Sequence, residues 1–381
     1  MSIDPDVVGV RILMIIVEGD AVIQVPHRED LLHRISKLDF LKNESFKRSQ
    51  IGLSLVIVLA FGTAFLAYGV AYNESDTRGV TAVAYSPDGK LLATVNGSIN
   101  IIQTSDGNVL KTLPVKNVIS IAFSNDGHTL AAGIRNSSKN IKLLDVDSGR
   151  LINTFECASS DVSTIAFAPN GLSLATGSSD GTTRLWRIPS GELVNANKIC
   201  CPVNGITFAP NGKKFATCSG NSNHSGEVRF WNTSNGRLMR SLIGHNRCIL
   251  SLAFSPDGNV IASGGLDEVV NLWRINDLKL LASMKTVCAV KSIAFSPNGQ
   301  QLAIGGGKKS EGFIQLWSVP NGNLLRSEIV DSRTIKWVGY SPKGESLVSA
   351  SEDAPSSTDN TRHPLAIWRV SDWKLVKSYG F

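Results

Sequence analysis

A recurring pattern of apolar and polar positions runs through about the last four fifths of the chain, and it is clearest in ILSLAFSPDGNVIASGGLDEVVNLW, from Ile249 to Trp273. β-branched and aromatic runs favour strands, and the Ser-Pro-Asp-Gly between the first two runs is typical of a type I turn. Asp267 marks a second tight turn. Strands are therefore predicted at 249–254, 260–263, 269–273 and 279–283. One copy of the pattern predicts a four-stranded antiparallel meander.

An aromatic residue just before the first turn allows the copies to be counted. Seven such residues follow one another at intervals of 38 to 46 residues: Tyr85, Phe123, Phe167, Phe208, Phe254, Phe295 and Tyr340. This interval is typical of four-stranded propeller blades, and a radial arrangement buries both faces of each meander against its neighbours. The fold class predicted is all-β: a seven-bladed β-propeller of four-stranded antiparallel blades over residues 80–381.

At these residues the sequence resembles the WD-repeat (WD40-repeat) family. The third strand of five copies ends in the tryptophan typical of that family: Trp186, Trp231, Trp273, Trp317 and Trp368. The resemblance implies one complete hydrogen-bonded set of histidine, hydroxyl, aspartate and tryptophan, at His245, Ser263, Asp267 and Trp273. We interpret this set as a structural network that locks one blade, because that is its usual role in the family.

Each copy runs from the innermost to the outermost strand without interruption. No strand is exchanged between the chain ends, and Trp373 to Tyr379 completes the last copy. We therefore expect the ring to close by packing of the first blade against the last.

Residues 1–50 form an N-terminal region without the repeat. The runs at 10–17 and 21–25, separated by Glu18-Gly19-Asp20, favour a short hairpin, with an apolar helix as the alternative. Leucine and isoleucine at helical spacing between Glu29 and Leu41 predict an amphipathic helix.

Residues 51–72, IGLSLVIVLAFGTAFLAYGVAY, contain no charged residue. A helix of this length spans a hydrocarbon core of about 30 Å, so the stretch predicts a single transmembrane helix that precedes the propeller. A buried helix and a cleaved signal peptide are the alternatives. Fifty residues precede the run, which is longer than a usual charged leader and favours an uncleaved anchor.

The positive charges near this stretch predict its orientation. Five lie on the N-terminal side, at Arg34, Lys37, Lys42, Lys47 and Arg48, whereas Arg78 and Lys90 are the nearest on the other side. We expect a single-pass protein with a cytoplasmic N-terminus and an extracytoplasmic propeller.

Cysteines precede the innermost strand in four successive copies, at Cys157, Cys200 with Cys201, Cys248 and Cys288, and Cys218 lies in a second strand. They are interpreted as small buried residues that ring one mouth of the channel, and disulfides between neighbouring copies are the alternative. No metal site is predicted, because the paired C-x-x-C spacing of zinc sites does not occur.

The sequence contains no recognisable catalytic constellation. The channel-facing positions of the inner strands supply no Asp, Glu or His, so acid-base catalysis there would lack its groups. The net charge of +6 suits several anionic partners, but no motif indicates nucleic acid. We therefore expect no enzyme activity, no cofactor and no nucleic-acid partner.

The distance from the second strand to the third varies between copies. It is 11 residues from Ala262 to Trp273, but 15 from Ala216 to Trp231, 14 from Ala303 to Trp317 and 20 from Val348 to Trp368. These insertions all project from one side of a propeller, which makes that side the candidate binding face. Its polar residues are Asn221, Asn223, His224, Lys308, Lys309, Glu352, Asp353, Asp359, Arg362 and His363.

The function predicted is that of a membrane-anchored scaffold for protein-protein interaction, attached through residues 51–72, with protein partners of unknown identity. An extracytoplasmic propeller enzyme and a cytoplasmic-facing scaffold in reversed orientation are the alternatives.

Overall fold

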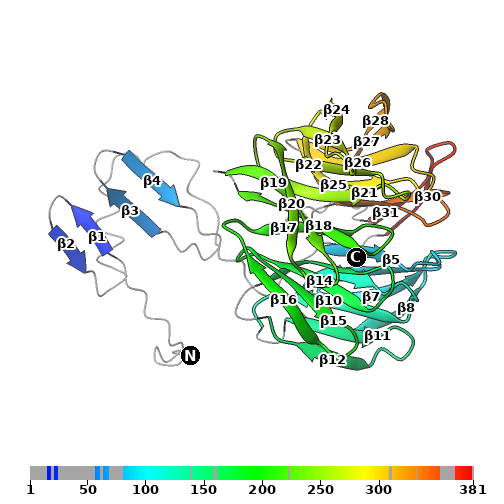
Figure 1. Ribbon diagram of the computed structural model, residues 1–381, viewed down its shortest axis with the longest axis horizontal. Helices are drawn as coiled ribbons and strands as arrows, with labels where there is room; N and C mark the ends of the chain where they lie inside the picture. Colours follow the sequence, from blue (N-terminus) through cyan, green and yellow to red (C-terminus); the bar gives the residue numbers. More distant parts are fainter. Residues whose placement is uncertain are drawn as a thin grey trace, which may run out of the picture. The chain divides into compact units, whose positions relative to one another are not determined.

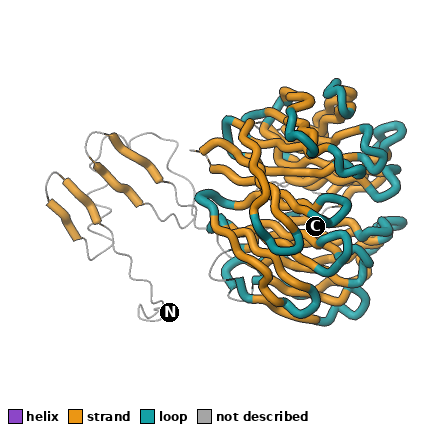
Figure 2. The backbone as a smooth tube through the Cα atoms, viewed as in Figure 1, coloured by secondary structure: helices purple, strands orange, loops and turns teal. Residues whose placement is uncertain are grey.

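The computed structural model describes residues 80–137, 140–157, 161–221, 224–308, 311–331, 333–351 and 365–379, and the backbone of four short strands nearer the N-terminus. The chain divides into two compact units, Met1–Asp76 and Thr77–Phe381. Every regular element among the described residues is a strand, as Figure 2 shows.

The first unit contains two described strand pairs. Strands β1 (Ile15–Glu18) and β2 (Ala21–Gln24) pair in antiparallel fashion with Glu18 opposite Ala21, within the range in which a hairpin was predicted. The amphipathic helix predicted between Glu29 and Leu41 lies outside the described residues.

The second pair falls inside the stretch for which a transmembrane helix was predicted. Strands β3 (Val56–Ala60) and β4 (Thr63–Ala67) are antiparallel there, so the helix over 51–72 is not confirmed. The physical reason is that β-branched Val56, Ile57 and Val58 favour extended backbone, and an apolar run alone does not distinguish helix from strand. None of the described elements is a helix of the length and apolar character that a membrane span requires.

The second unit is a ring of seven four-stranded antiparallel sheets, which confirms the predicted propeller (Figure 1). In each blade the strands pair in chain order, and they are called a, b, c and d from the innermost outward. Blades one to three comprise β5 (Ala82–Tyr85), β6 (Leu91–Asn96), β7 (Ser98–Gln103), β8 (Val109–Leu113); β9 (Val118–Phe123), β10 (Thr129–Ile134), β11 (Ile141–Asp145), β12 (Leu151–Phe155); β13 (Val162–Phe167), β14 (Ser173–Ser178), β15 (Thr182–Arg187) and β16 (Glu192–Lys198).

Blades four to seven comprise β17 (Val203–Phe208), β18 (Lys214–Asn221), β19 (His224–Asn232), β20 (Leu238–His245); β21 (Ile249–Phe254), β22 (Val260–Gly265), β23 (Val269–Arg274), β24 (Leu280–Lys285); β25 (Ala289–Phe295), β26 (Gln301–Lys308), β27 (Glu311–Ser318), β28 (Leu324–Asp331); β29 (Ile335–Tyr340), β30 (Ser346–Ser351), β31 (Leu365–Arg369) and β32 (Leu375–Tyr379). The first strands of successive blades adjoin one another, so they line the centre of the ring.

The turn between strands a and b is fixed by its own side chains. In blade five the amide of Gly258 donates to the carbonyl of Ser255 at 2.8 Å, and the Ser255 hydroxyl accepts from the amide of Val260 at 2.9 Å. Asp257 accepts from the Ser255 hydroxyl and from the amide of Asn259. Gly258 has φ +72°, a value that glycine adopts without strain. The local sequence thus sets the angle between the two strands.

The a–b turns of neighbouring blades pack on one another through proline and glycine. A Cβ on Gly258 would lie 3.3 Å from Cδ of Pro210 in the preceding blade, and one on Gly89 would lie 2.9 Å from Cδ of Pro342. Gly171 has no such neighbour, because Asn125 replaces the proline in blade two. The repeated Pro-x-Gly therefore joins blades as well as turning the chain.

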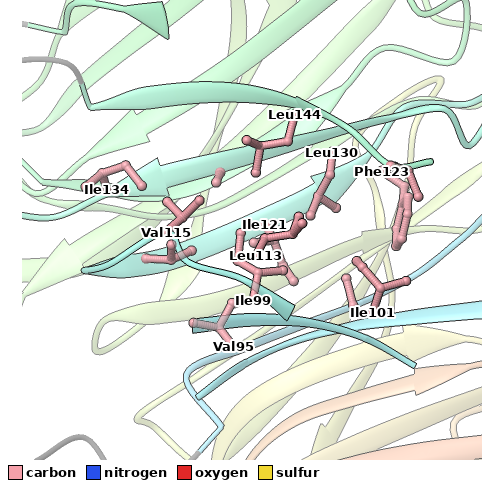
Figure 3. Packing of buried hydrophobic residues seen from close by; sticks show 14 residues of the cluster. Val95, Ile99, Ile101, Leu113, Val115, Ile121, Phe123, Leu130, Ile134 and Leu144 are labelled. Atoms are coloured by element: carbon pink, nitrogen blue, oxygen red, sulfur yellow. The ribbon is translucent and has the colours of Figure 1, made fainter. Parts of the chain in front are cut away.

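The hydrophobic core is divided among the blade interfaces. In Figure 3, Val95, Ile99 and Leu113 of blade one face Ile121 and Leu130 of blade two in a single cluster. Equivalent clusters lie at the other interfaces. The fold is stabilised because each blade buries the apolar face of its neighbour.

Among the described strands, none is exchanged between the first blade and the last. Blade seven consists of β29 to β32 alone, and blade one of β5 to β8, which confirms the expected closure by face packing. Val348, Leu365 and Ile367 of blade seven form one buried cluster with Val83 and Leu92 of blade one. The ammonium group of Lys377 also donates to the carbonyl of Asp106 across this joint.

Candidate functional site

The four residues of the predicted network lie in one chain of hydrogen bonds that joins the end of β20 in blade four, at His245, to Ser263, Asp267 and Trp273 of blade five. His245 Nδ1 lies 2.9 Å from Asp267 Oδ2, and His245 Nε2 lies 2.8 Å from Ser263 Oγ. Trp273 Nε1 donates to the same hydroxyl at 3.0 Å. Strand d of blade four is thereby tied to strand b, the b–c turn and strand c of blade five.

A serine, a histidine and an aspartate in this order resemble a nucleophilic triad, but their surroundings differ from those of a catalytic site. Ser263 is fully buried and its hydroxyl already accepts from Trp273, so no reacting carbonyl has access to it. The side chains of His245 and Asp267 are only 1% and 9% exposed. The geometry supports a structural role for this set, but it joins blade four to blade five, whereas a lock within one blade was predicted.

Sequence reasoning missed a fifth member of this network. Asn271 Nδ2 donates to the carbonyl of Gly244 at 3.0 Å and lies 3.3 Å from His245 Nε2. Asn271 is two residues before Trp273 on strand c, where the other blades carry residues as different as Lys142, Arg184 and Gln315. No repeated motif marks this position, which explains the omission.

Three other blades retain part of the network. A hydroxyl on strand b accepts from the strand-c tryptophan: Thr176 from Trp186 at 3.0 Å, Thr217 from Trp231 at 2.9 Å and Ser349 from Trp368 at 2.9 Å. In blade six Ile304 takes the place of the hydroxyl, and Trp317 Nε1 has no hydrogen-bond partner in the part of the chain that the structure describes.

The polar side chains of the innermost strands are used to join blades. Ser120 Oγ donates to the carbonyl of Val162 at 2.9 Å. Ser163 Oγ donates to the carbonyl of Val203 at 2.6 Å, and Asn204 Nδ2 to that of Ile249 at 2.9 Å. Each bond runs from one blade to the first strand of the next, so these groups serve the ring.

The predicted binding face contains two elongated b–c hairpins. In blade four the strand ladder extends to Asn221 opposite His224, and in blade six it extends to Lys308 opposite Glu311. The extra residues therefore lengthen strands, whereas extra loop was expected. The reason is that additional antiparallel pairs satisfy backbone amides and carbonyls that a loop would leave to water.

Among the predicted binding residues, Lys308 has a described side chain. It is 55% exposed, and its Nζ lies 3.4 Å from Oε1 of Glu268 in the b–c turn of blade five. Asn221 and His224 are placed by their backbone alone. The remaining candidates lie outside the described residues: Asn223, Lys309, Glu352, Asp353, Asp359, Arg362 and His363.

A buried ion pair that the sequence did not reveal lies between blades six and seven. Arg333 Nε is 3.1 Å from Asp331 Oδ1, and the two side chains are 8% and 7% exposed. The Ser351 hydroxyl donates to Asp331 Oδ2 at 2.8 Å. Ser351 is the last residue of strand b, so this cluster anchors the start of the long b–c segment of blade seven.

All six cysteines are free thiols, and all except Cys200 are buried. Burial raises the pKa of Cys157 and of Cys288 to about 11, which keeps these thiols protonated at neutral pH. Cys200 Sγ and Cys201 Sγ lie 3.1 Å apart. The described side chains of His, Cys, Asp and Glu include no group of three with the arrangement of a metal site. The buried thiols act as small apolar residues.

The ring of four-stranded blades with a strand-c tryptophan bonded to a strand-b hydroxyl defines a class of repeat propeller. Five segments match the family described as WD domain, G-beta repeat: residues 71–109, 149–187, 196–232, 236–274 and 279–318. Together they make up about half of the chain. This chain belongs to the WD40-repeat family.

Several curated proteins are similar to this chain. Autophagy-related protein 16 of Arabidopsis thaliana is 23% identical over 270 residues, which are 67% of this chain and 50% of that protein. Telomerase protein component 1 of Rattus norvegicus is 28% identical over 62% of this chain and 9% of its own length. An uncharacterized WD repeat-containing protein of Synechocystis is 33% identical over 38% of this chain and 43% of its own. The matched region thus spans half or less of each of these relatives.

Proposed function

We propose that this chain is a scaffold that binds other proteins through the b–c side of its propeller, and that residues 51–72 anchor it in a membrane. The observation that carries the first part is the pair of elongated hairpins in blades four and six on one side of the ring. They flank the shorter turn of blade five. Lys308 of blade six forms an ion pair with Glu268 in that turn.

The inner polar groups support binding over catalysis. Ser120, Ser163 and Asn204 donate to backbone carbonyls of neighbouring blades, and the hydroxyl of Ser263 is buried. The hydrogen bonds between blades hold the ring rigid. A rigid ring presents its turns at fixed separations. WD-repeat propellers are interaction scaffolds as a family, and one relative is named telomerase protein component 1.

The binding face is tested by shortening the b–c hairpins of blades four and six to the 11-residue spacing found between Ala262 and Trp273. A second variant, Lys308→Glu, reverses one exposed charge on the same side, and Lys343→Glu is its control in the a–b turn on the opposite side. Proteins captured by the full chain from gently solubilised membranes are quantified by mass spectrometry.

We expect the trimmed chain and Lys308→Glu to lose partners that Lys343→Glu retains. Thermal unfolding is monitored in parallel, so that loss of fold is recognised. Unchanged capture by a folded, trimmed chain would reject the b–c side as the binding site.

Membrane attachment rests on the 22 uncharged residues of the 51–72 stretch, and orientation on the excess of Lys and Arg before it. Protease treatment of sealed vesicles is expected to remove the N-terminal region from the cytoplasmic side and to leave the propeller protected. Digestion of the propeller from the cytoplasmic side would support the reversed orientation, and release of the intact chain by alkaline carbonate would contradict anchoring.

A further inference from the structure

The outer edge of the joint between blades four and five differs from the other joints. At four joints a polar side chain on strand d donates to a carbonyl in the c–d turn of the next blade. The pairs are Lys111 with Asp147, Asn153 with Pro189, Asn195 with Asn235 and Lys377 with Asp106. In each case the next turn contains a glycine with positive φ, at Gly149, Gly191, Gly236 and Gly107. The absence of a side chain lets the two blades approach.

Two joints carry a large residue in place of this glycine. Leu278 in blade five has φ +59° and Trp373 in blade seven has φ +58°. In both cases the preceding strand d carries an arginine at the equivalent position, Arg240 and Arg326, each opposite the residue before the strand-c tryptophan. These two joints are therefore matched in sequence, and they can be compared directly.

The arginine of the sixth blade makes both a cation–π contact and an ion pair. Arg326 lies 5.8 Å above the ring of Trp373, and its Nη1 is 3.0 Å from Oε1 of Glu328. In blade four the position equivalent to Glu328 is Leu242. Within the described part of the chain, the guanidinium of Arg240 makes no hydrogen bond or ion pair. Its joint lacks the carboxylate that the matched joint supplies.

Arg240 lines a surface groove of about 220 Å³ together with a second cation, Lys214. The other lining residues are Phe230, Met239, Ile275, Asn276 and Leu278. The ammonium group of Lys214 likewise makes no hydrogen bond or ion pair with the described residues. The equivalent first residue of strand b in the other blades is uncharged: Leu91, Thr129, Ser173, Val260, Gln301 and Ser346. Among the residues that the structure describes, no acidic side chain lines the groove, and Asp277 of the adjoining turn is paired with Arg274 at 3.1 Å.

The groove lies beside an open sheet edge. β20 is the outermost strand of its blade, so its outer edge pairs with no described strand. Its exposed apolar side chains are Leu238, Met239 and Ile243, with 51%, 52% and 73% of their surface accessible. An extended peptide can add to such an edge and place alternate side chains in adjacent pockets.

We propose that this groove, lined by Lys214 and Arg240, binds an extended segment of a partner protein that carries an aspartate or glutamate next to a bulky apolar residue. The carboxylate of the segment takes the place that Glu328 holds at the matched joint. The apolar side chain packs on Met239 and Leu278. The volume is below the roughly 300 to 1,000 Å³ of pockets that enclose a whole small ligand, and it suits one or two side chains of a peptide.

The proposal is tested by selecting randomised 12-residue peptides displayed on phage against the full chain held in mild detergent. Binding of the selected peptides is then measured by fluorescence anisotropy. The test variant carries Lys214→Gln and Arg240→Gln. The matched control carries Lys198→Gln and Lys285→Gln, which remove two charges from exposed positions on other outer strands. Thermal unfolding confirms that both variants are folded.

We expect the selected peptides to contain an acidic residue beside leucine, isoleucine, phenylalanine or methionine. Their affinity is expected to fall at least tenfold for the test variant, and also when glutamine replaces the acid, but to remain unchanged for the control. Selection of peptides without an acid, no selection, or equal binding by the test variant would overturn the proposal. Binding of laurate that depends on the two cations, without acid-dependent peptide binding, would assign the groove to an anionic amphiphile and overturn it as well.

This groove lies at the c–d turns, and the elongated hairpins project from the opposite side of the ring. A chain with trimmed hairpins is therefore expected to retain peptide binding. If trimming the hairpins of a folded protein abolished peptide binding as well as partner capture, the placement of the peptide at the groove would be contradicted. The two proposals thus fail in distinguishable ways.

Discussion

Blades five and six bury the same tryptophan in different ways. Trp273 and Trp317 are both 7% exposed at the end of strand c. Trp273 donates to Ser263, and the hydrogen bonds continue through His245 to Asp267. Trp317 lies in a blade in which Ile304 replaces the hydroxyl. The same strand order and register form in both blades. The network is therefore not required to form a blade, and its contribution is local: it ties the outer strand of blade four to strand b and the b–c turn of blade five.

The largest expected effect is that of His245→Ala, which removes the link from blade four to the network that blade five has and blade six lacks. The substitution leaves the hydroxyl of Ser263 and the carboxylate of Asp267 buried without their shared partner, which costs about 1 to 3 kcal/mol of unfolding free energy. Chemical denaturation measures the change. His128→Ala is the control, because that imidazole is 70% exposed and its loss is expected to change stability by less than about 0.5 kcal/mol. Unchanged unfolding together with lost partner binding would show instead that His245 belongs to a functional site.

A smaller difference is expected between Trp273→Phe and Trp317→Phe. Both remove a similar apolar area, but the first also removes the donor to Ser263, whereas Trp317 Nε1 has no partner among the described residues. We expect Trp273→Phe to be more destabilising than Trp317→Phe by about 1 kcal/mol, the net value of one buried hydrogen bond. Equal losses in thermal and chemical unfolding would show that packing alone sets the contribution of this tryptophan.

The smallest effect concerns the a–b turns, where blade five has Asp257 and blade six has Asn298. The hydroxyl of Ser255, followed by the amide of Asn259, lowers the pKa of Asp257. A lowered folded-state pKa contributes stability above the unfolded-state value, near pH 4, and this contribution is lost as the pH falls through the folded-state pKa. Asp257→Asn is therefore expected to weaken the dependence of stability on pH between pH 5 and pH 3. Identical acid denaturation curves for the two proteins would contradict this role.

The sequence predicted the blades well because their determinants are local. Ser255-Pro256-Asp257-Gly258 fixes one turn through contacts within six residues, and alternation of apolar residues fixes the strands on either side. Repetition of the motif then established the number of blades. The network of His245 and Trp273 was also accessible, because family resemblance marks those positions.

The apolar stretch at 51–72 was less well determined by its sequence. A run without charge and without a clear period of 3.6 or 2.0 is compatible with more than one element, and the described strands β3 and β4 lie within it. The b–c insertions illustrate the same limit in the propeller. Their length was evident, but whether the added residues at Asn221 and Lys308 form loop or ladder depends on pairing between strands.

The sequence by itself determined where each strand and turn of the propeller lies, because hydrophobic period, turn residues and repeat length act over a few neighbouring positions. Tertiary structure alone decided what meets between blades: Asn271 beside His245, Lys377 beside Asp106, and Arg240 in one groove with Leu278. These pairs join residues 26 to 271 positions apart along the chain. Their distances depend on the packing angle and separation of whole sheets, which the pattern within one blade does not specify.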